Sequence, residues 1–332
     1  MTSQTTTRPA PPESIKAVPV RHPGRWIGAA IVLLIVAMFV HMLVTNKAFN
    51  WRFMVDNMFR PPIIGGVRTA IIVTVLAMAI GIAIGTVVAV LRLSPNPILR
   101  WAAWVYTWFF RAVPRVVLLV LFGNLGILYA RYEFGLPFDR QLGNLFGIHD
   151  FSARIFGLDA NTLLSGFTAG LLGLALSEGA YMAEIVRAGI QSIDPGQAEA
   201  AQALGLSRTQ TIRRVVLPQA MRVIVPPTGN ETIAMLKDTS LLAFVPVTNE
   251  LFYQLSAVGN RTFQVFPMLV AACLWYLFLT SLLMTGQYFI ERHFGRGFSG
   301  QQRRVKGEPA GAVATDTGPE GPPYVTGGSH GV

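Results

Sequence analysis

Long apolar runs separated by short polar segments are the main pattern of this sequence. Six runs are each long enough to cross a hydrocarbon core of about 30 Å, at about 1.5 Å per helical residue. They are residues 27–44, 67–91, 113–130, 163–190, 223–245 and 266–290. Residues 101–110 are also apolar and carry several tryptophans, which favours an interfacial or elbow helix ahead of the third run. The pattern predicts an all-α, polytopic membrane protein with about six transmembrane helices.

Four regions follow from this pattern. Residues 1–26 and 293–332 hold few large apolar side chains, which predicts a disordered tail at each end. Residues 27–64 are predicted to form a first transmembrane helix followed by an external loop. Residues 65–292 are predicted to form the main transmembrane domain, which includes a polar loop at 191–222.

The distribution of charge orients these helices. Only 13% of the 332 residues are charged, against about a quarter in a soluble domain. Eighteen Lys and Arg residues lie in the segments on one side of the predicted membrane and seven on the other, so the positive-inside rule places both termini and residues 191–222 in the cytoplasm. The net charge of +10 therefore reflects topology and not nucleic acid binding. On the outer side, residues 131–161 are expected to fold as a re-entrant or surface helix.

The loop between the fourth and fifth runs has the ingredients of a structured elbow. A short helix is expected to begin after Pro195, to break at Gly205 and to be followed by a second helix with Ser207 as its N-cap. Glycine suits the break because it tolerates a positive φ. A helix-Gly-helix elbow of this kind is suited to lie in a groove on a soluble partner.

The elbow also carries acidic, small and aliphatic residues at a recognisable spacing. They are Glu199, Ala200, Ala201, Gly205, Val215, Leu217 and Pro218. This set resembles the cytoplasmic signature of permease subunits of ATP-binding-cassette importers, with Val215 in place of the usual Ile. Residues 66–69, 110–114, 179–190, 229–231 and 236–241 narrow the resemblance to the polar amino acid subfamily, the histidine, glutamine and glutamate type. Residues 115–117 depart from the Leu-Leu-Val-Gln usually found there.

The resemblance implies a five-helix permease core in a bacterial cell membrane, forming the translocation pathway of an ATP-driven importer for polar amino acids. The implied partners are a second permease subunit, identical or homologous, a dimer of cytoplasmic ATPases, an external solute-binding protein and membrane lipid. Six residues are implied to couple to the ATPase: Glu199, Ala200, Ala201, Gly205, Leu217 and Pro218. Among them, Glu199 is expected to open the elbow's helix, and the two alanines to present a small docking surface.

The sequence contains no Walker A loop. ATP is therefore expected to bind to the partner subunit, and this chain to carry no catalytic site and no cofactor. The single cysteine, Cys273, lies in an apolar run and offers neither a disulfide framework nor a metal cluster. An ion-coupled secondary transporter or channel is the alternative function, which the elbow disfavours because such proteins need no ATPase dock. An intramembrane enzyme would need paired catalytic motifs that the sequence lacks.

Polar residues inside the apolar runs are the candidates for the substrate pathway. A charge at a helix centre costs about 2.5 to 3.5 kcal/mol, so such residues usually face the bundle interior or a wet cavity. The candidates are Glu178, Tyr181, Glu184, Asn230, Lys237 and Asp238. Glu178 and Tyr181 lie nearly on one helical face and are expected to meet an ammonium group or a cationic side chain. Asn230, just after Pro226 and Pro227, is expected to offer a donor to a carboxylate near a kinked helix.

Structural roles compete with transport roles at some of these positions. Glu184 and Arg187 are three residues apart, and a mutual ion pair is slightly favoured for them. For Lys237 and Asp238, mutual neutralisation and a place in the pathway are weighted equally. Gly81 and Gly85 form a G-x-x-x-G motif, which is typical of close helix packing.

Overall fold

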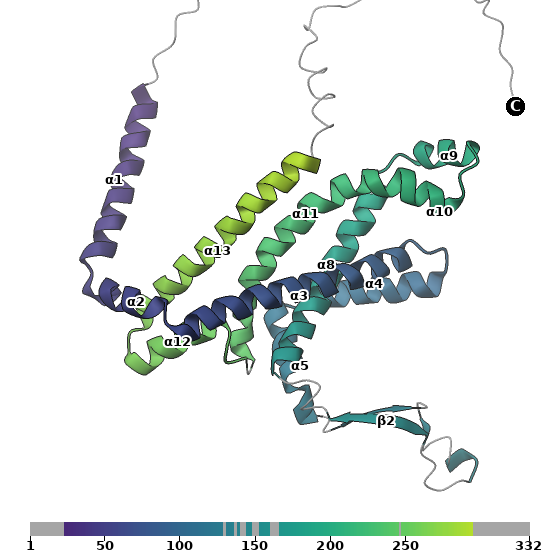
Figure 1. The fold of residues 1–332 in the computed structure, drawn as a ribbon, viewed down its shortest axis with the longest axis horizontal. Helices are drawn as coiled ribbons and strands as arrows, with labels where there is room; N and C mark the ends of the chain where they lie inside the picture. The colour runs from purple at the N-terminus through teal and green to yellow at the C-terminus, as the bar shows by residue number, and fades with distance from the viewer. Residues whose placement is uncertain are drawn as a thin grey trace, which may run out of the picture. The chain divides into compact units, whose positions relative to one another are not determined.

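The computed structural model describes residues 23–128, 131–135, 138–139, 144–147, 153–159, 166–245 and 247–294. Helices dominate it, which confirms the predicted all-α fold (Figure 1). The longer helices are α1 (Pro23–Thr45), α3 (Pro61–Arg92), α4 (Pro97–Ala112), α5 (Arg115–Leu128), α8 (Gly166–Gln191), α11 (Leu217–Asp238) and α13 (Val265–Phe294). The shorter ones are η1 (Lys47–Phe49), α2 (Trp51–Met58), α9 (Pro195–Ala203), α10 (Arg208–Thr211), η2 (Ile212–Val216), η3 (Thr239–Phe244) and α12 (Leu251–Thr262).

The predicted disordered tails lie almost wholly outside the described residues. Where they overlap them, the prediction is wrong, because α1 already begins at Pro23 and α13 continues to Phe294. The arginines at these helix ends are compatible with helix, since arginine is a good helix former.

Among the described residues, four helices are long and apolar enough to cross a membrane, namely α1, α3, α8 and α13. Helices α4 and α5 pass the same test only as a pair, bent by 104° at a short break. α11 is not in this group of described helices, because Arg222, Asn230 and Glu231 lower its hydropathy. The structure therefore supports four or five of the six predicted spans, and the span in α11 stays a prediction.

The third predicted span begins at a different place. Val113 is extended, with φ −83° and ψ 130°, and Pro114 follows it, so α4 ends at Ala112 and α5 starts at Arg115. α5 alone is 14 residues, or about 21 Å, which is shorter than a hydrocarbon core. The apolar stretch at 101–110 lies inside α4, which confirms a separate helix there.

The segment between α5 and α8 contains a two-stranded antiparallel ribbon. Its strands are β1 (Arg131–Gly135) and β2 (Arg154–Asp159), with Arg131 opposite Asp159. The prediction of a re-entrant or surface helix is therefore wrong for these residues. Charged and aromatic residues alternate along β1, which is a strand pattern and not a helical one. The side chain of Arg154 pairs with Glu133 and Asp139, which ties β2 to its neighbours.

The chain divides into two compact units. The first comprises the described parts of residues 1–70 and 247–277. In it, a Cβ on Gly66 would lie 2.7 Å from the Cα of Leu251, so only glycine fits this approach. Glu250 caps α12, accepting hydrogen bonds from two backbone N–H groups and, at 2.8 Å, from the Tyr276 hydroxyl. Burial raises the pKa of Glu250, although these hydrogen bonds oppose the shift.

The second unit comprises the described parts of residues 71–246 and 278–332. Small residues let α3 pack closely on α8 within it. A Cβ on Gly85 would lie 2.5 Å from the Cβ of Met182, and one on Gly81 would lie 2.8 Å from the Cγ of Glu178. The packing role predicted for the G-x-x-x-G motif is thus confirmed. Because Glu178 sits against Gly81, this packing also fixes the position of a candidate site residue.

Candidate functional site

The break between α4 and α5 places a charged residue at the centre of the second unit. Pro114 has no N–H and restricts Val113 to extended backbone, which stops α4 and turns the chain by 104°. Arg115 is the first residue of α5 after this turn. Its guanidinium group consequently reaches side chains of both α8 and α11.

Arg115 pairs with three carboxylates. Its Nη2 lies 3.0 Å from Oε2 of Glu178 and 3.7 Å from Oε2 of Glu231, and its Nη1 pairs with Oδ2 of Asp238. The side chain of Glu178 is fully buried and that of Arg115 is 14% exposed, whereas Glu231 and Asp238 are 26% and 31% exposed. We call these four residues the carboxylate cluster. One atom in it, Oε1 of Glu178, is buried with no hydrogen-bond partner among the described residues.

Tyr181 adds an aromatic face to this cluster. The guanidinium carbon of Arg115 lies 4.8 Å from the centroid of its ring, and that of Arg111 lies 5.5 Å away, both within cation–π range. A cavity of about 420 Å³ is lined by Tyr181, Arg111, Glu184 and Trp104, among others. The site thus combines one buried and two partly exposed carboxylates, an aromatic ring and open volume within one unit.

The structure gathers three of the six predicted pathway residues, namely Glu178, Tyr181 and Asp238. Glu184 lies apart, because its Oε2 pairs with Nη2 of Arg187 at 2.6 Å and its Oε1 with Nη2 of Arg92 at 3.3 Å. The pairing favoured for Glu184 and Arg187 is therefore present, and Glu184 lines the cavity without joining the carboxylate cluster.

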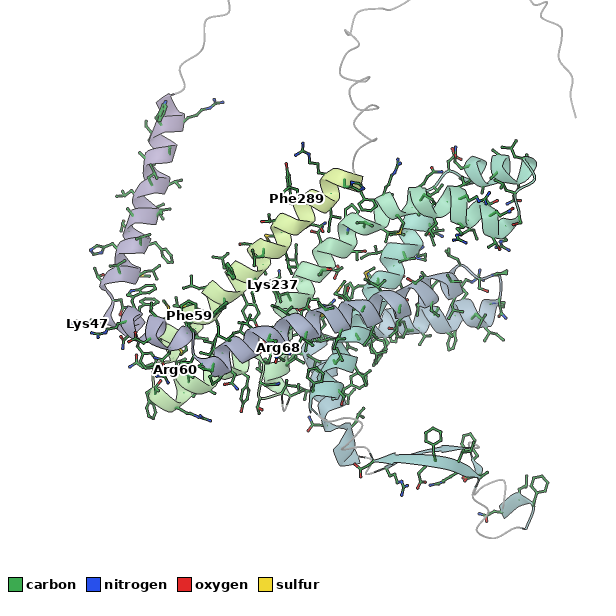
Figure 2. The ribbon with its side chains drawn as sticks, in the orientation of Figure 1. Lys47, Phe59, Arg60, Arg68, Lys237 and Phe289 are labelled. Carbon is green, nitrogen blue, oxygen red and sulfur yellow. The ribbon has the colours of Figure 1, made fainter. Side chains whose placement is uncertain are left out.

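The remaining two candidates, Asn230 and Lys237, do not join the carboxylate cluster. Both side chains are exposed, and Lys237 can be seen on α11 in Figure 2. Mutual neutralisation of Lys237 and Asp238 is not observed among the described residues, since Asp238 pairs with Arg115 instead. Their roles in transport stay predictions.

Two members of the cluster are missing from the predicted site. Glu231 lies in a segment that resembles the family, and Arg115 lies in one that departs from the family pattern. A signal for both exists in the charge balance of the sequence. Carboxylates at 178, 231 and 238 in apolar runs favour a nearby cation, and an arginine directly after a proline break is one candidate beside Lys237.

The elbow has the predicted structure. Asp194 caps α9 by accepting a hydrogen bond from the N–H of Gly196 at 2.8 Å, and Pro195 is the first helical residue. Gly205 then adopts a φ of +82°. Ser207 forms a capping box with Gln210, which opens α10 and leads through η2 into α11. The expected break and N-cap are confirmed, and the first helix starts at Pro195 itself, one residue earlier than expected.

The surface of the elbow differs from expectation at two positions. Glu199 lies in the second turn of α9 and does not open it, because the Asp194 cap starts the helix four residues earlier. Ala200 is exposed, but Ala201 is only 4% exposed, so it packs inside the elbow and offers no docking surface. Leu204, beside Gly205, is 83% exposed. Leu217 and Pro218 are exposed at the start of α11.

A multi-pass helical chain with an ionic site between its helices and a structured polar elbow has the architecture of a transporter subunit. Comparison of the sequence with known families gives its class. The chain belongs to the family of binding-protein-dependent transport system inner membrane components, which it matches over residues 81–296. It is a multi-pass inner membrane protein and the translocation subunit of an ATP-binding-cassette importer for polar amino acids.

Several individual relatives are themselves amino acid permeases. The chain is 42% identical to the arginine transport system permease protein ArgU of Corynebacterium glutamicum, over 87% of this chain and 85% of that protein. It is 31% identical to the glutamate/aspartate import permease protein GltK of Escherichia coli O157:H7, over 74% of this chain and 98% of that protein. Among solved structures, it resembles an amino acid ABC transporter described with histidines, with a TM-score of 0.58 and 29% identity, over 73% of this chain and 98% of that chain.

Proposed function

We propose that this subunit forms the translocation pathway for a cationic amino acid, with arginine as the first candidate. The observation that carries the proposal is the charge of the carboxylate cluster. Three carboxyl groups face one guanidinium, that of Arg115, and acidic groups still outnumber cations when Arg111 is counted. An excess of this sign attracts a cation and repels an acidic substrate. The arginine transport permease among the relatives supports the same substrate class.

Burial makes this charge effective. Coulomb interactions are several-fold stronger at the low effective dielectric of a protein interior than in water. Glu178 is fully buried, and its Oε1 is an acceptor with no partner among the described residues. A cationic group that donates a hydrogen bond to this oxygen would satisfy both its charge and its lone pairs.

Energy is proposed to come from separate ATPase subunits. In this arrangement, two permease subunits, identical or homologous, bind an ATPase dimer through their elbows, and an external solute-binding protein delivers the amino acid. Both termini and the elbow lie in the cytoplasm. The exposed Leu204 and Glu199 of the elbow are available for such docking. ATP binds to the partner, and this chain needs no cofactor and performs no catalysis.

Replacing Glu178 with glutamine tests the site. We expect at least a tenfold loss of arginine uptake by proteoliposomes that contain the complete importer, because the substitution removes the buried charge with little change in volume. Radiolabelled arginine uptake, with lysine and glutamate as competitors, measures the effect. Asp56→Asn is the matched control, since Asp56 is an exposed acid on α2.

Two outcomes would contradict the proposal. One is unchanged arginine uptake by Glu178→Gln, and the other is glutamate competing with labelled arginine as well as unlabelled arginine does. ATP dependence is tested in the same vesicles. Uptake that persists with a disabled ATPase and collapses with the ion gradient would favour an ion-coupled transporter instead.

A further inference from the structure

The carboxylate cluster already holds a guanidinium group. Arg115 pairs with Glu178, Glu231 and Asp238 at once, through both of its terminal nitrogens. A guanidinium is a planar fork of donors that matches carboxylates better than an ammonium does. The cluster is thus arranged around the chemical group that terminates an arginine side chain.

We propose that this cluster is a guanidinium-binding site, occupied in the empty pathway by Arg115 and taken over by the guanidinium of the substrate. The proposal rests on the proposed function and names its ligand chemistry. Arg115 is then a tethered competitor, and the substrate must displace it in order to bind Glu178.

Electrostatics explains why a competitor is needed. Three carboxylates left without a cation inside a membrane protein would be costly, because buried charges persist only when paired. Arg115 supplies that cation between transport events. The exchange of one guanidinium for another leaves the net charge of the cluster unchanged. It also disfavours cations of a different shape. An ammonium, for example, cannot form the same set of hydrogen bonds to the carboxylates as a planar guanidinium does.

A displaced Arg115 has a place to go. Its guanidinium carbon already lies 4.8 Å from the centroid of Tyr181, so the ring can hold the charge by a cation–π interaction. The cavity of about 420 Å³ on which Tyr181 opens provides the volume. Glu178, in contrast, is fixed in place, because Gly81 on α3 lies against its side chain. The movable partner in the exchange is therefore the arginine.

The same residues allow a different mechanism, in which Arg115 binds the α-carboxylate of the substrate. The two mechanisms predict opposite effects of removing its charge. A competitor lowers the apparent affinity by the fraction of time for which it occupies the site, so its removal strengthens binding. A residue that binds the carboxylate contributes affinity, so its removal weakens binding of any ligand that carries a carboxylate.

The decisive experiment measures binding of labelled arginine, and of its decarboxylated analogue agmatine, to the complete importer in lipid nanodiscs. For Arg115→Leu we expect about tenfold tighter binding of both ligands and slower uptake, because release from the uncontested cluster becomes harder. Arg68→Leu, which removes an exposed arginine of α3 labelled in Figure 2, is the control. It should change the dissociation constant of neither arginine nor agmatine. Unchanged affinity for both ligands, or weaker arginine binding with unchanged agmatine binding, overturns the proposal.

A second measurement does not depend on the fold of that variant. Arg115→Ala should gain thermal stability from millimolar guanidinium ion, relative to sodium ion at equal ionic strength. The reason is that the free guanidinium ion can bind the carboxylates that Arg115 pairs with in the unmodified protein. Equal stability in the two salts overturns the proposal.

Arginine uptake by the unmodified importer tests the proposed function separately from the displacement of Arg115. Absent uptake contradicts the proposed function, whereas normal uptake with no gain of affinity in Arg115→Leu contradicts only the displacement of Arg115.

Discussion

Replacing Gly205 with valine is expected to abolish ATP-driven uptake while leaving the chain inserted in the membrane. Gly205 has a φ of +82°, a conformation that β-branched residues rarely adopt. Among the described residues, no atom outside Gly205 and its two chain neighbours lies within 4 Å of the place where a Cβ would stand, so the effect comes from backbone strain and not from a clash. Left-handed backbone costs a residue with a side chain roughly 1 to 2 kcal/mol, enough to redirect α9 relative to α10. The measurements are co-purification of the ATPase and arginine uptake.

Asparagine at the same position is the matched control. Its short polar side chain tolerates left-handed backbone far better than valine does, and the site has room for it. Gly205→Asn is therefore expected to keep most of the uptake and the bound ATPase. If valine and asparagine act alike, the geometry of the elbow does not transmit the energy of ATP hydrolysis, and the coupling role proposed for residues 195–218 fails.

The elbow could be predicted from the sequence because its signals are local. Pro195 favours the start of a helix, Gly205 allows the turn, and Ser207 caps the helix that follows. Each residue acts within about four positions of itself. The exposure of individual side chains could not be predicted in the same way. Ala201 is buried by packing within the elbow, which depends on the angle between its two halves.

The carboxylate cluster, in contrast to the elbow, could not be predicted from local signals. Arg115 and Glu178 are 63 residues apart, and they meet only because the chain turns by 104° after Val113. The proline predicts a break, but neither its angle nor the side chains that it brings together. The sequence therefore indicates Glu178 and Asp238 as isolated charges in apolar runs, and misses the arginine that joins them. The ribbon of β1 and β2 escapes prediction for a related reason, since the pairing of distant short strands is also non-local.

Glycines on α3 connect the fold to the site. Gly81 and Gly85 let α3 approach α8 closely, and Gly81 packs against the side chain of Glu178, which pairs with Arg115. Between apolar helices in lipid, small residues permit such contact, and van der Waals packing then holds it. The stability of the α3–α8 pair and the geometry of the site thus depend on the same two glycines, Gly81 and Gly85.

Gly85→Leu is accordingly expected to cause a severe loss of folded protein. A Cβ at residue 85 would lie 2.5 Å from the Cβ of Met182 and 2.9 Å from the backbone nitrogen of Ala183, so α3 would have to separate from α8. Overpacking of this kind costs about 1 to 3 kcal/mol, and more where backbone must move. Gly28→Leu on α1 is the control, because nothing lies within 4 Å of its would-be Cβ. We expect Gly28→Leu to purify normally and Gly85→Leu to lose most of its monodisperse peak in detergent chromatography. Equal yields of the two variants would show that the contact between α3 and α8 is not needed for folding.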